Sequence, residues 1–344
     1  MKVTIKAIAE MAGVHRSTVD KVLHKRVGVS DDVREKIQSI IDELGYEPNP
    51  IGKALKRQEE KLVIAAVLLK VDALEQIKEG MEKAIRTYKG LNMEIRYHVI
   101  QYPDVDAQVK VIQDLVREGV EGILLLPIHD ARVKEAIDEA VGAGVPVITT
   151  NSDIEGSKRM CFVGQDSEKA GRVAGRLMGE FLGSKGQVAV ITSALHSETS
   201  VAVAGREKGF QELLRQTYPD IDIRERVESM EDPDLVYQDT VKILDRNPEL
   251  KGIYITCGGV SGLGKALKDK GMAGRIKVVC FERYPEILAL MKEGVVNCTI
   301  DSELEEQGYR TCRILADHLL YDREPEKELL FTKSSILVKE SIEE

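Results

Sequence analysis

Residues 3–23 read Val3-Thr4-Ile5-Lys6-Ala7-Ile8-Ala9-Glu10-Met11-Ala12-Gly13-Val14-His15-Arg16-Ser17-Thr18-Val19-Asp20-Lys21-Val22-Leu23. Apolar residues recur at helical spacing on both sides of Gly13, which predicts two short helices joined by a tight turn. A glycine at that point permits the sharp turn that sets two helices nearly perpendicular. The second helix then presents Arg16, Ser17 and Lys21 on its outer face, where they suit base edges and phosphates in a DNA major groove.

A third helix is predicted to begin after Ser30, because apolar residues again follow at helical spacing, from Val33 to Leu44. Residues 1–47 are therefore expected to form a small all-α head. Pro48-Asn49-Pro50 then suits the start of another helix. That helix would have only about two turns, too few to be stable alone. We interpret residues 48–60 as a conditional hinge and linker.

The segment 3–23 resembles the helix-turn-helix head of the LacI/GalR family of transcriptional regulators. The resemblance continues through Val29-Ser30, Arg34-Glu35-Lys36-Ile37 and Leu44-Gly45-Tyr46-Glu47-Pro48-Asn49. It implies sequence-specific binding of operator DNA, with a hinge leucine that wedges into the minor groove and kinks the duplex. The residues that it assigns to DNA are Thr4, Arg16, Ser17, Thr18, Lys21, His24, Asn49, Leu55 and Lys56.

The head departs from the family pattern at a few positions. His15 and Asp20 stand where serine is usual, His24 where asparagine is usual, and Gly52 where alanine is usual. The structural alternative for this segment is a three-helix module that binds another protein.

From residue 61 onward, apolar strand-length segments alternate with helical patterns. The strands expected are 62–69, 93–100, 122–126, 145–150, 160–163, 187–192, 221–227, 252–256, 276–281 and 295–300. Such alternation is typical of parallel sheets covered by helices on both faces. We expect an α/β body, 61–344, of two doubly wound parallel-sheet lobes, one from about 61–160 and 292–325, the other from about 161–291 and 326–344. The family resemblance implies a type-I periplasmic-binding-protein-like domain that senses a small molecule and dimerises.

Open parallel sheets bind ligands beyond the carboxyl ends of their strands. Arg206-Glu207-Lys208-Gly209-Phe210 matches the family's R-x-x-G-F/W pattern, whose arginine faces the ligand, and Glu282 stands where an aspartate is usual. The effector-binding residues predicted from strand ends and resemblance together are Asn151, Asp153, Arg206, Gly258, Glu282, Asp301 and Ser302. They offer donors and acceptors for a molecule with several hydroxyls. A neutral monosaccharide or cyclic polyol is therefore expected, with a sugar phosphate as the second choice.

Gly259-Val260-Ser261-Gly262-Leu263-Gly264-Lys265 satisfies the start of a phosphate-binding loop, but Ala266 replaces the serine or threonine that would bind Mg²⁺. A sugar- or nucleotide-binding enzyme is thus an alternative, as is an exported solute-binding protein. The sequence assembles no set of nucleophile, base and orienting residue and no metal-ligand spacing, so neither an enzyme nor a cofactor is expected.

Charge and composition limit the partners. The chain of 344 residues has a net charge of −9, but residues 1–58 hold 11 basic and 8 acidic side chains, or +3. Only the head is therefore expected to meet a polyanion.

No apolar run could span a membrane and no signal-peptide core follows Met1, so a cytoplasmic protein is expected. Five scattered cysteines are typical of reduced, buried thiols. The expected partners are a pseudo-palindromic operator, the effector, and a second copy in a homodimer or larger assembly.

Overall fold

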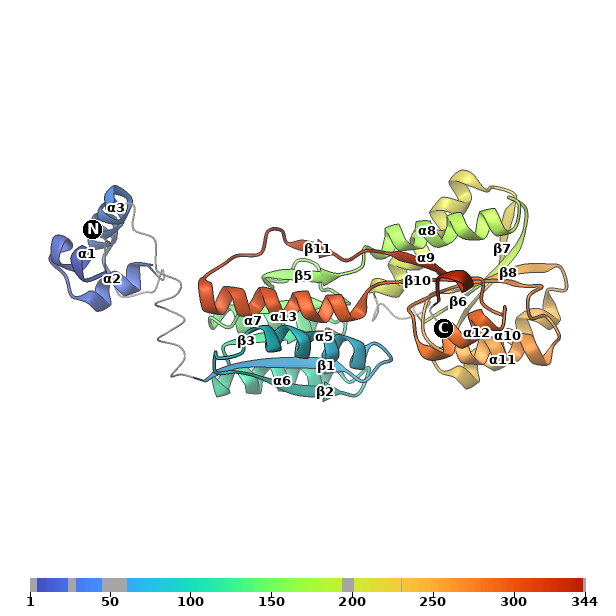
Figure 1. The fold of residues 1–344 in the computed structure, drawn as a ribbon, viewed down its shortest axis with the longest axis horizontal. Coiled ribbons are helices and arrows are strands. Elements are labelled where there is room, and N and C mark those ends of the chain that lie inside the picture. The colour runs from blue at the N-terminus through green and yellow to red at the C-terminus, as the bar shows by residue number, and fades with distance from the viewer. Residues whose placement is uncertain (1–4, 24–28, 45–60, 194–200, 230, 343–344) are drawn as a thin grey trace. The chain divides into compact units, whose positions relative to one another are not determined.

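The computed structural model describes residues 5–23, 29–44, 61–193, 201–229 and 231–342. The chain divides into two compact units, Met1–Lys56 and Arg57–Glu344, which we call the head and the body. The body contains two sheets with their helices, and Figure 1 shows them as two lobes.

Three helices form the described part of the head: α1 (Ile5–Ala12), α2 (Arg16–Leu23) and α3 (Asp31–Leu44). One fully buried side chain from each helix, Ile8, Val19 and Ile37, meets the others in a common apolar core. Between α1 and α2, Gly13 has a φ of 69°, in the left-handed region that side chains with a Cβ seldom adopt. The predicted glycine turn between two helices is confirmed.

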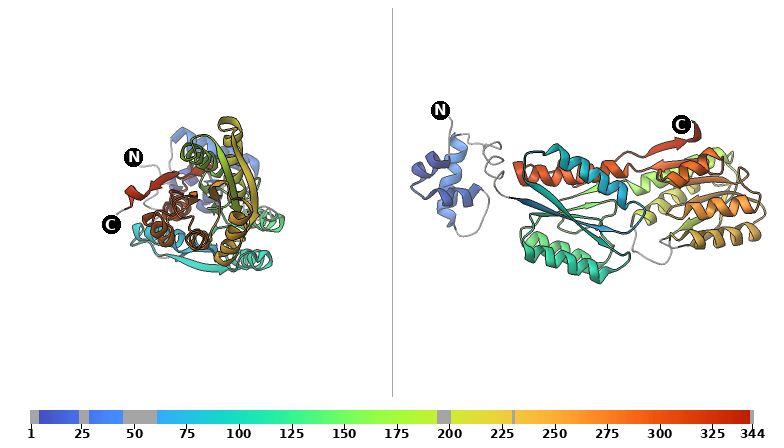
Figure 2. Two further views of the ribbon diagram at one scale, coloured as in Figure 1. Left: turned by 90° about the vertical axis from the view of Figure 1, so that its right-hand side faces the viewer. Right: turned by 60° about the horizontal axis from the view of Figure 1, so that its bottom comes forward.

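The first lobe of the body is a six-stranded sheet in the order β11-β5-β4-β3-β1-β2. Its strands are β1 (Leu62–Leu69), β2 (Met93–Ile100), β3 (Gly122–Leu125), β4 (Val147–Thr150), β5 (Cys161–Gly164) and β11 (Leu329–Phe331). Its helices are α5 (Leu74–Thr87), α6 (Val105–Glu118), α7 (Ala131–Gly142) and α13 (Leu304–Tyr321). Figure 2 shows α5 and α13 on one face of this sheet and α6 and α7 on the other.

The second lobe is a six-stranded sheet in the order β12-β10-β9-β8-β6-β7. Its strands are β6 (Gly186–Thr192), β7 (Ile221–Glu228), β8 (Leu250–Ile255), β9 (Lys277–Phe281), β10 (Cys298–Asp301) and β12 (Ser335–Val338). Its helices are α8 (Ser167–Phe181), α9 (Val201–Thr217), α10 (Pro233–Arg246), α11 (Val260–Asp269), α12 (Pro285–Lys292) and the short η1 (Lys339–Ser341). In Figure 1, α8 and α9 lie on one face of the sheet and α10, α11 and α12 on the other.

The predicted alternation of strands and helices is confirmed, and the strands pair in parallel with one exception. β12 runs antiparallel to β10, with Cys298 opposite Val338. β11 and β12 were not predicted, because they are only 3 and 4 residues long and lie at sheet edges, where apolar patterning is weak. All five cysteines are buried and unpaired, as expected.

The expected lobe boundaries, near residues 160, 292 and 325, all lie too early in the chain. β5 still belongs to the first sheet, β10 belongs to the second, and β11 returns to the first. The chain therefore passes between lobes after Gly164, after Asp301 and after Phe331. An apolar run predicts a strand but does not say which strand it will pair with, and this pairing decides the boundary.

Candidate functional sites

The outer face of α2 is polar and open. The side chains of Arg16, Ser17 and Lys21 are exposed, whereas Val19 and Val22 on the inner face are buried. Thr18, which was predicted with them, is half-buried. The helix thus offers hydrogen-bond donors and positive charge on the side that the sequence analysis predicted for a major groove.

His15 lies directly before α2 and caps it. The Ser17 backbone N–H donates to His15 Nδ1 over 3.3 Å, and Ser17 Oγ lies 2.8 Å from the same nitrogen. A side-chain acceptor at this position satisfies one of the free N–H groups in the first helical turn. The histidine therefore supplies the cap that a serine supplies in the family pattern.

Several predicted DNA contacts lie outside the described residues, and their roles stay predictions. They are Thr4, His24, Asn49, Leu55 and Lys56, together with the expected hinge over 48–60.

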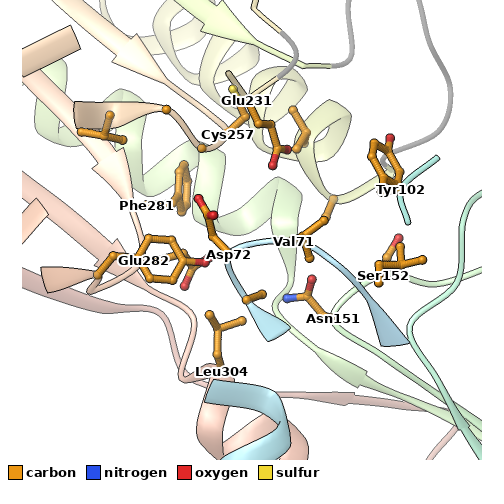
Figure 3. Close-up of a pocket in the computed structure, with 18 of the residues that line it drawn as sticks. Val71, Asp72, Tyr102, Asn151, Ser152, Glu231, Cys257, Phe281, Glu282 and Leu304 are labelled. Atoms are coloured by element: carbon orange, nitrogen blue, oxygen red, sulfur yellow. The ribbon is translucent and has the colours of Figure 1, made fainter. Parts of the chain in front are cut away.

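The body has a cavity between its lobes, at the carboxyl ends of strands from both sheets (Figure 3). The first lobe contributes the segments that follow β1, β2, β3 and β4, and the second contributes α9 and the segments that follow β7, β8 and β9. This is the place where parallel sheets bind ligands. Of the seven predicted effector residues, the four that line the cavity are Asn151, Arg206, Gly258 and Glu282.

Arg206 of α9 is buried and held on several sides. Its Nη2 lies 2.6 Å from Glu282 Oε1 and 3.0 Å from Gln165 Oε1, and its Nη1 donates to the Thr256 carbonyl over 3.2 Å. The guanidinium carbon lies 3.9 Å from the centre of the Phe281 ring. Four fixed partners leave the guanidinium one orientation, so a ligand would meet a preorganised planar donor.

Glu282 connects this arginine to the first lobe through a chain of hydrogen bonds. Its Oε2 accepts from the Ser302 hydroxyl over 2.7 Å, and Gln307 Nε2 donates to Ser302 Oγ over 3.1 Å. Gln307 belongs to α13 of the first lobe, and its Oε1 accepts from Asn151 Nδ2 over 3.3 Å. Ser302 is therefore a supporting residue behind the cavity wall. Residues of both lobes are joined in one network.

Three cavity residues share an unusual backbone conformation. Asn151, Glu231 and Glu282 have φ values of 63°, 62° and 71°. Side chains with a Cβ seldom adopt this left-handed region, and such residues cluster at functional sites. They make up three of the six non-glycine residues with positive φ in the described part of the chain.

Asp153 and Asp301 do not line the cavity, contrary to the sequence expectation. Asp153 forms a two-pronged ion pair with buried Arg159, at 2.5 and 2.6 Å, and it accepts from the Thr149 hydroxyl. Asp301 Oδ1 accepts from the Glu303 backbone N–H over 3.1 Å, and burial raises the pKa of its carboxyl. Both carboxylates are thus held by partners within the fold rather than presented to the cavity.

Three carboxylates of the cavity wall, Asp72, Glu231 and Glu286, were not predicted from the sequence. Asp72 and Glu231 belong to opposite lobes. Glu231 Oε1 accepts from Ser193 Oγ over 3.0 Å. Burial raises the pKa of the Glu231 carboxyl, and the negative charge of Asp72 raises it further. The position of Asp72 just after β1 was a usable signal, whereas Glu231 lies in a connection without any pattern.

The glycines that resemble a phosphate loop serve helix packing. A Cβ on Gly262 would lie 1.9 Å from the Pro233 carbonyl oxygen, so the glycine lets α11 approach α10 closely. Lys265 is exposed, and its Nζ lies 4.8 Å from the centre of the Tyr237 ring of α10. The lysine thus contacts the neighbouring helix on the outside of the lobe, which does not support the nucleotide-binding alternative.

Within the described residues, no helix is both long and apolar enough to cross a bilayer. In that same part of the chain, no group of three or more His, Cys, Asp or Glu side chains is arranged to hold a metal ion.

Comparisons with known proteins separate along the same division into head and body. Residues 4–49 match the lacI family of bacterial regulatory proteins, and residues 64–322 match the periplasmic binding protein domain. The ribose import binding protein RbsB of Bacillus subtilis is 24% identical over 265 residues, which cover 74% of this chain and 79% of RbsB. The HTH-type transcriptional regulator TreR of Salmonella typhimurium is 28% identical over 127 residues, 36% of this chain and 38% of TreR.

The fold of the body has close counterparts among solved structures. A solute-binding protein of an ABC transporter from Burkholderia graminis, solved in complex with D-arabinose, superimposes with a TM-score of 0.76 at 24% identity. The superposition covers 81% of this chain and 96% of that protein. The two-lobed architecture is thus the fold of the periplasmic binding proteins.

Proposed function

The chain belongs to the lacI family of bacterial regulatory proteins and carries a periplasmic binding protein domain, and from this we propose that it is a transcriptional repressor whose operator binding responds to a sugar. The observation that carries the proposal is the presence of two distinct sites on one chain. An exposed polar helix face stands in the head, and a cavity with a preorganised arginine lies between the lobes of the body.

The head distinguishes this function from that of a solute-binding protein. The ribose-binding and arabinose-bound relatives resemble the body, but a helix-turn-helix head serves recognition of DNA. We propose that the protein acts in the cytoplasm, because an operator lies on the chromosome. One head offers few base contacts, so we propose that a homodimer binds a pseudo-palindromic operator.

We assign the cavity to ligand binding rather than to catalysis. Its buried charged pair, Arg206 with Glu282, is mutually neutralised and fixed by further hydrogen bonds. Such a pair orients a ligand's hydroxyls well but does not supply a free nucleophile or base. The effector that fits it is a small polyhydroxy compound, a monosaccharide or cyclic polyol. The carboxylates in the wall disfavour a sugar phosphate, because a phosphate would be repelled by them.

The route from effector to DNA follows from the two-lobed construction. A ligand that contacts both lobes binds the closed arrangement of the body more tightly than an open one, and only this difference in affinity can shift the equilibrium between them. The hydrogen-bonded series Glu282–Ser302–Gln307–Asn151 already connects the lobes across one of the chain passages. We propose that the change in lobe arrangement is passed to the hinge, which is ordered for DNA binding in one state only.

The experiment that tests the function uses the full chain. Selection from random duplexes yields the preferred DNA sequence, and fluorescence anisotropy then measures its affinity at fixed salt. A panel of sugars, polyols, sugar phosphates and purines is added, and thermal shift identifies binders. We expect a sugar or polyol both to raise the melting temperature and to change operator affinity. The proposal fails if no specific DNA sequence is selected, or if purines alone produce the response.

A further inference from the structure

Two carboxylates from opposite lobes approach each other beside Gly258. A Cβ on Gly258 would lie 3.1 Å from Asp72 Oδ2 and 3.4 Å from Glu231 Oε2, so both side chains use the space that the glycine leaves open. Figure 3 shows both carboxylates directed into the cavity. A ligand in this part of the cavity therefore meets negative charge from both lobes.

This negative charge has no matching cation in the described part of the chain. Arg206, which lines the same cavity, is paired with Glu282 at 2.6 Å. Lys70 lines the outer end of the space beside Asp72 and Glu231, but its side chain is exposed and forms no ion pair with either. Two like charges in a partly buried site are unfavourable unless a positive group joins them or one carboxyl takes up a proton, and the pKa of Glu231 is already raised by burial and by Asp72. An ammonium group is the partner that would keep both carboxylates ionised.

Ser152, which lines the same cavity, has a hydroxyl without a partner in the described part of the chain. The residue is only 9% exposed, and its Oγ is enclosed and has no hydrogen-bond partner within the described residues. A buried polar group without a partner costs free energy, and a ligand in the cavity supplies the missing hydrogen bond only if the Ser152 hydroxyl turns toward it.

We propose that the effector is an amino sugar, a monosaccharide whose protonated amine binds between Asp72 and Glu231. The proposal rests on the sugar-responsive function above and narrows its ligand. The ring hydroxyls would bind Asn151, Ser152 and the Arg206–Glu282 pair. This ligand differs from the neutral sugar expected from the sequence, which did not include Asp72 and Glu231 in the site.

The same contact accounts for lobe closure. Asp72 follows β1 in the first lobe and Glu231 follows β7 in the second, so without ligand their repulsion opposes close approach of the lobes. An ammonium group between them replaces that repulsion by two charge-assisted hydrogen bonds. Because this gain exists only when both lobes contact the amine, the amino sugar favours the closed arrangement.

The rest of the cavity wall favours a sugar ring over a simple amine. Tyr102 and Tyr284 contribute aromatic surface, which suits the apolar face of a sugar ring. A linear diamine would satisfy the two carboxylates but leave Ser152 and the Arg206–Glu282 pair without new hydrogen bonds.

Calorimetry on the full chain tests the proposal with four probes: D-glucosamine, D-galactosamine, D-mannosamine and D-allosamine. Each is compared with its neutral parent hexose and its N-acetylated form, and putrescine serves as the simple amine. At neutral pH we expect one amino sugar to bind roughly ten- to a hundredfold more tightly than its parent, the range for hydrogen bonds to charged groups. Asp72→Asn and Glu231→Gln, which keep the side-chain shape, should each remove most of this preference. Glu135→Gln makes the same carboxylate-to-carboxamide change at an exposed position of α7, and this control variant should retain the preference for the amino sugar.

Three results would overturn the proposal. They are equal or tighter binding of the neutral or N-acetylated sugars, an amine preference that survives in both cavity variants, and binding of putrescine as tight as that of the best amino sugar. Operator release measured in parallel separates this failure from failure of the function. If a neutral sugar releases the operator, the sugar-responsive repressor stands and the amino sugar is wrong. If no sugar acts on the operator, both are wrong.

Discussion

Arg206 and Glu282 form a buried ion pair at the cavity wall, with Nη2 and Oε1 2.6 Å apart. The pair joins α9 to the end of β9, and the Arg206 guanidinium packs against the Phe281 ring. Burial makes each partner depend on the other, because removal of one leaves an unpaired charge away from water. The same dependence makes the pair a sensitive probe of the ligand site.

Arg206→Ala should abolish detectable sugar binding, since it removes a preorganised donor and frees Glu282 to move. It should also destabilise the body by roughly 3–5 kcal/mol, the usual effect of breaking a buried pair. Calorimetry and denaturant unfolding measure the two effects. Arg215→Ala, at an exposed position of the same helix, is the matched control and should change neither. Undiminished sugar binding in the Arg206 variant would show that the cavity is not the effector site.

Asp153→Ala should separate structural support from ligand contact. The substitution leaves buried Arg159 without its two-pronged partner, so we expect a loss of stability of roughly 3 kcal/mol or more. Because Asp153 does not line the cavity, the ranking of sugars by affinity should stay as in the parent protein. If the variant remains folded at the temperature of the assay and its ranking of sugars by affinity differs from that of the parent, Asp153 does contact the ligand.

The contrast between Arg206 and Asp153 shows how far a sequence can predict this site. A polar residue after a strand is correctly placed near the carboxyl edge of the sheet, but the pattern does not say whether its side chain faces the cavity or a neighbour. The Asp153 carboxylate faces a neighbour, because it forms an ion pair with Arg159. For Arg206 the motif R-x-x-G-F adds the missing direction, and the structure places it in the cavity wall.

The proximity of Asp72 and Glu231 could not be predicted from patterns in the sequence. The two residues are 159 positions apart, on segments whose local patterns say nothing about each other. Their approach depends on how the two lobes are joined, and the predicted junctions lie too early in the chain. The strands themselves were predictable, because long apolar runs such as 62–69 admit few alternatives.

Lys21→Ala should weaken operator binding and reduce its dependence on salt. Lys21 is exposed on the outer face of α2, and a lysine that neutralises one phosphate contributes about one unit to the slope of log affinity against log salt. Anisotropy titrations between low and moderate salt give this slope. Lys185→Ala, an exposed lysine of the body, removes the same charge and should leave the slope unchanged. An unchanged slope in the Lys21 variant would remove this residue from the DNA contacts.

Leu55→Ala tests the hinge, which lies outside the described residues. If Leu55 wedges between base steps, its removal should lower operator affinity by about 2–4 kcal/mol and reduce the bend of the DNA. Sugar binding by the body should be unaffected. Electrophoretic bending assays and anisotropy measure the two DNA properties. Parent-like affinity together with a parent-like bend would disprove the wedge.

Glu231→Gln should stabilise the ligand-free protein at neutral pH. Burial raises the pKa of Glu231 above its ordinary 4.5, so between these two values the folded state binds more protons than the unfolded state. Stability then falls as pH rises through that window, and the penalty is complete above the raised pKa. A glutamine has no such penalty.

The variant should therefore exceed the parent by on the order of 1 kcal/mol at pH 7.5, with a difference that shrinks as the pH falls toward 4.5. Thermal unfolding across this range measures the difference, and Glu135→Gln provides the exposed reference. A saturating amino sugar should reverse the order, because only the carboxylate holds the amine. If Glu231→Gln follows Glu135→Gln at every pH, the carboxylate carries no buried charge and the repulsion between the lobes does not exist.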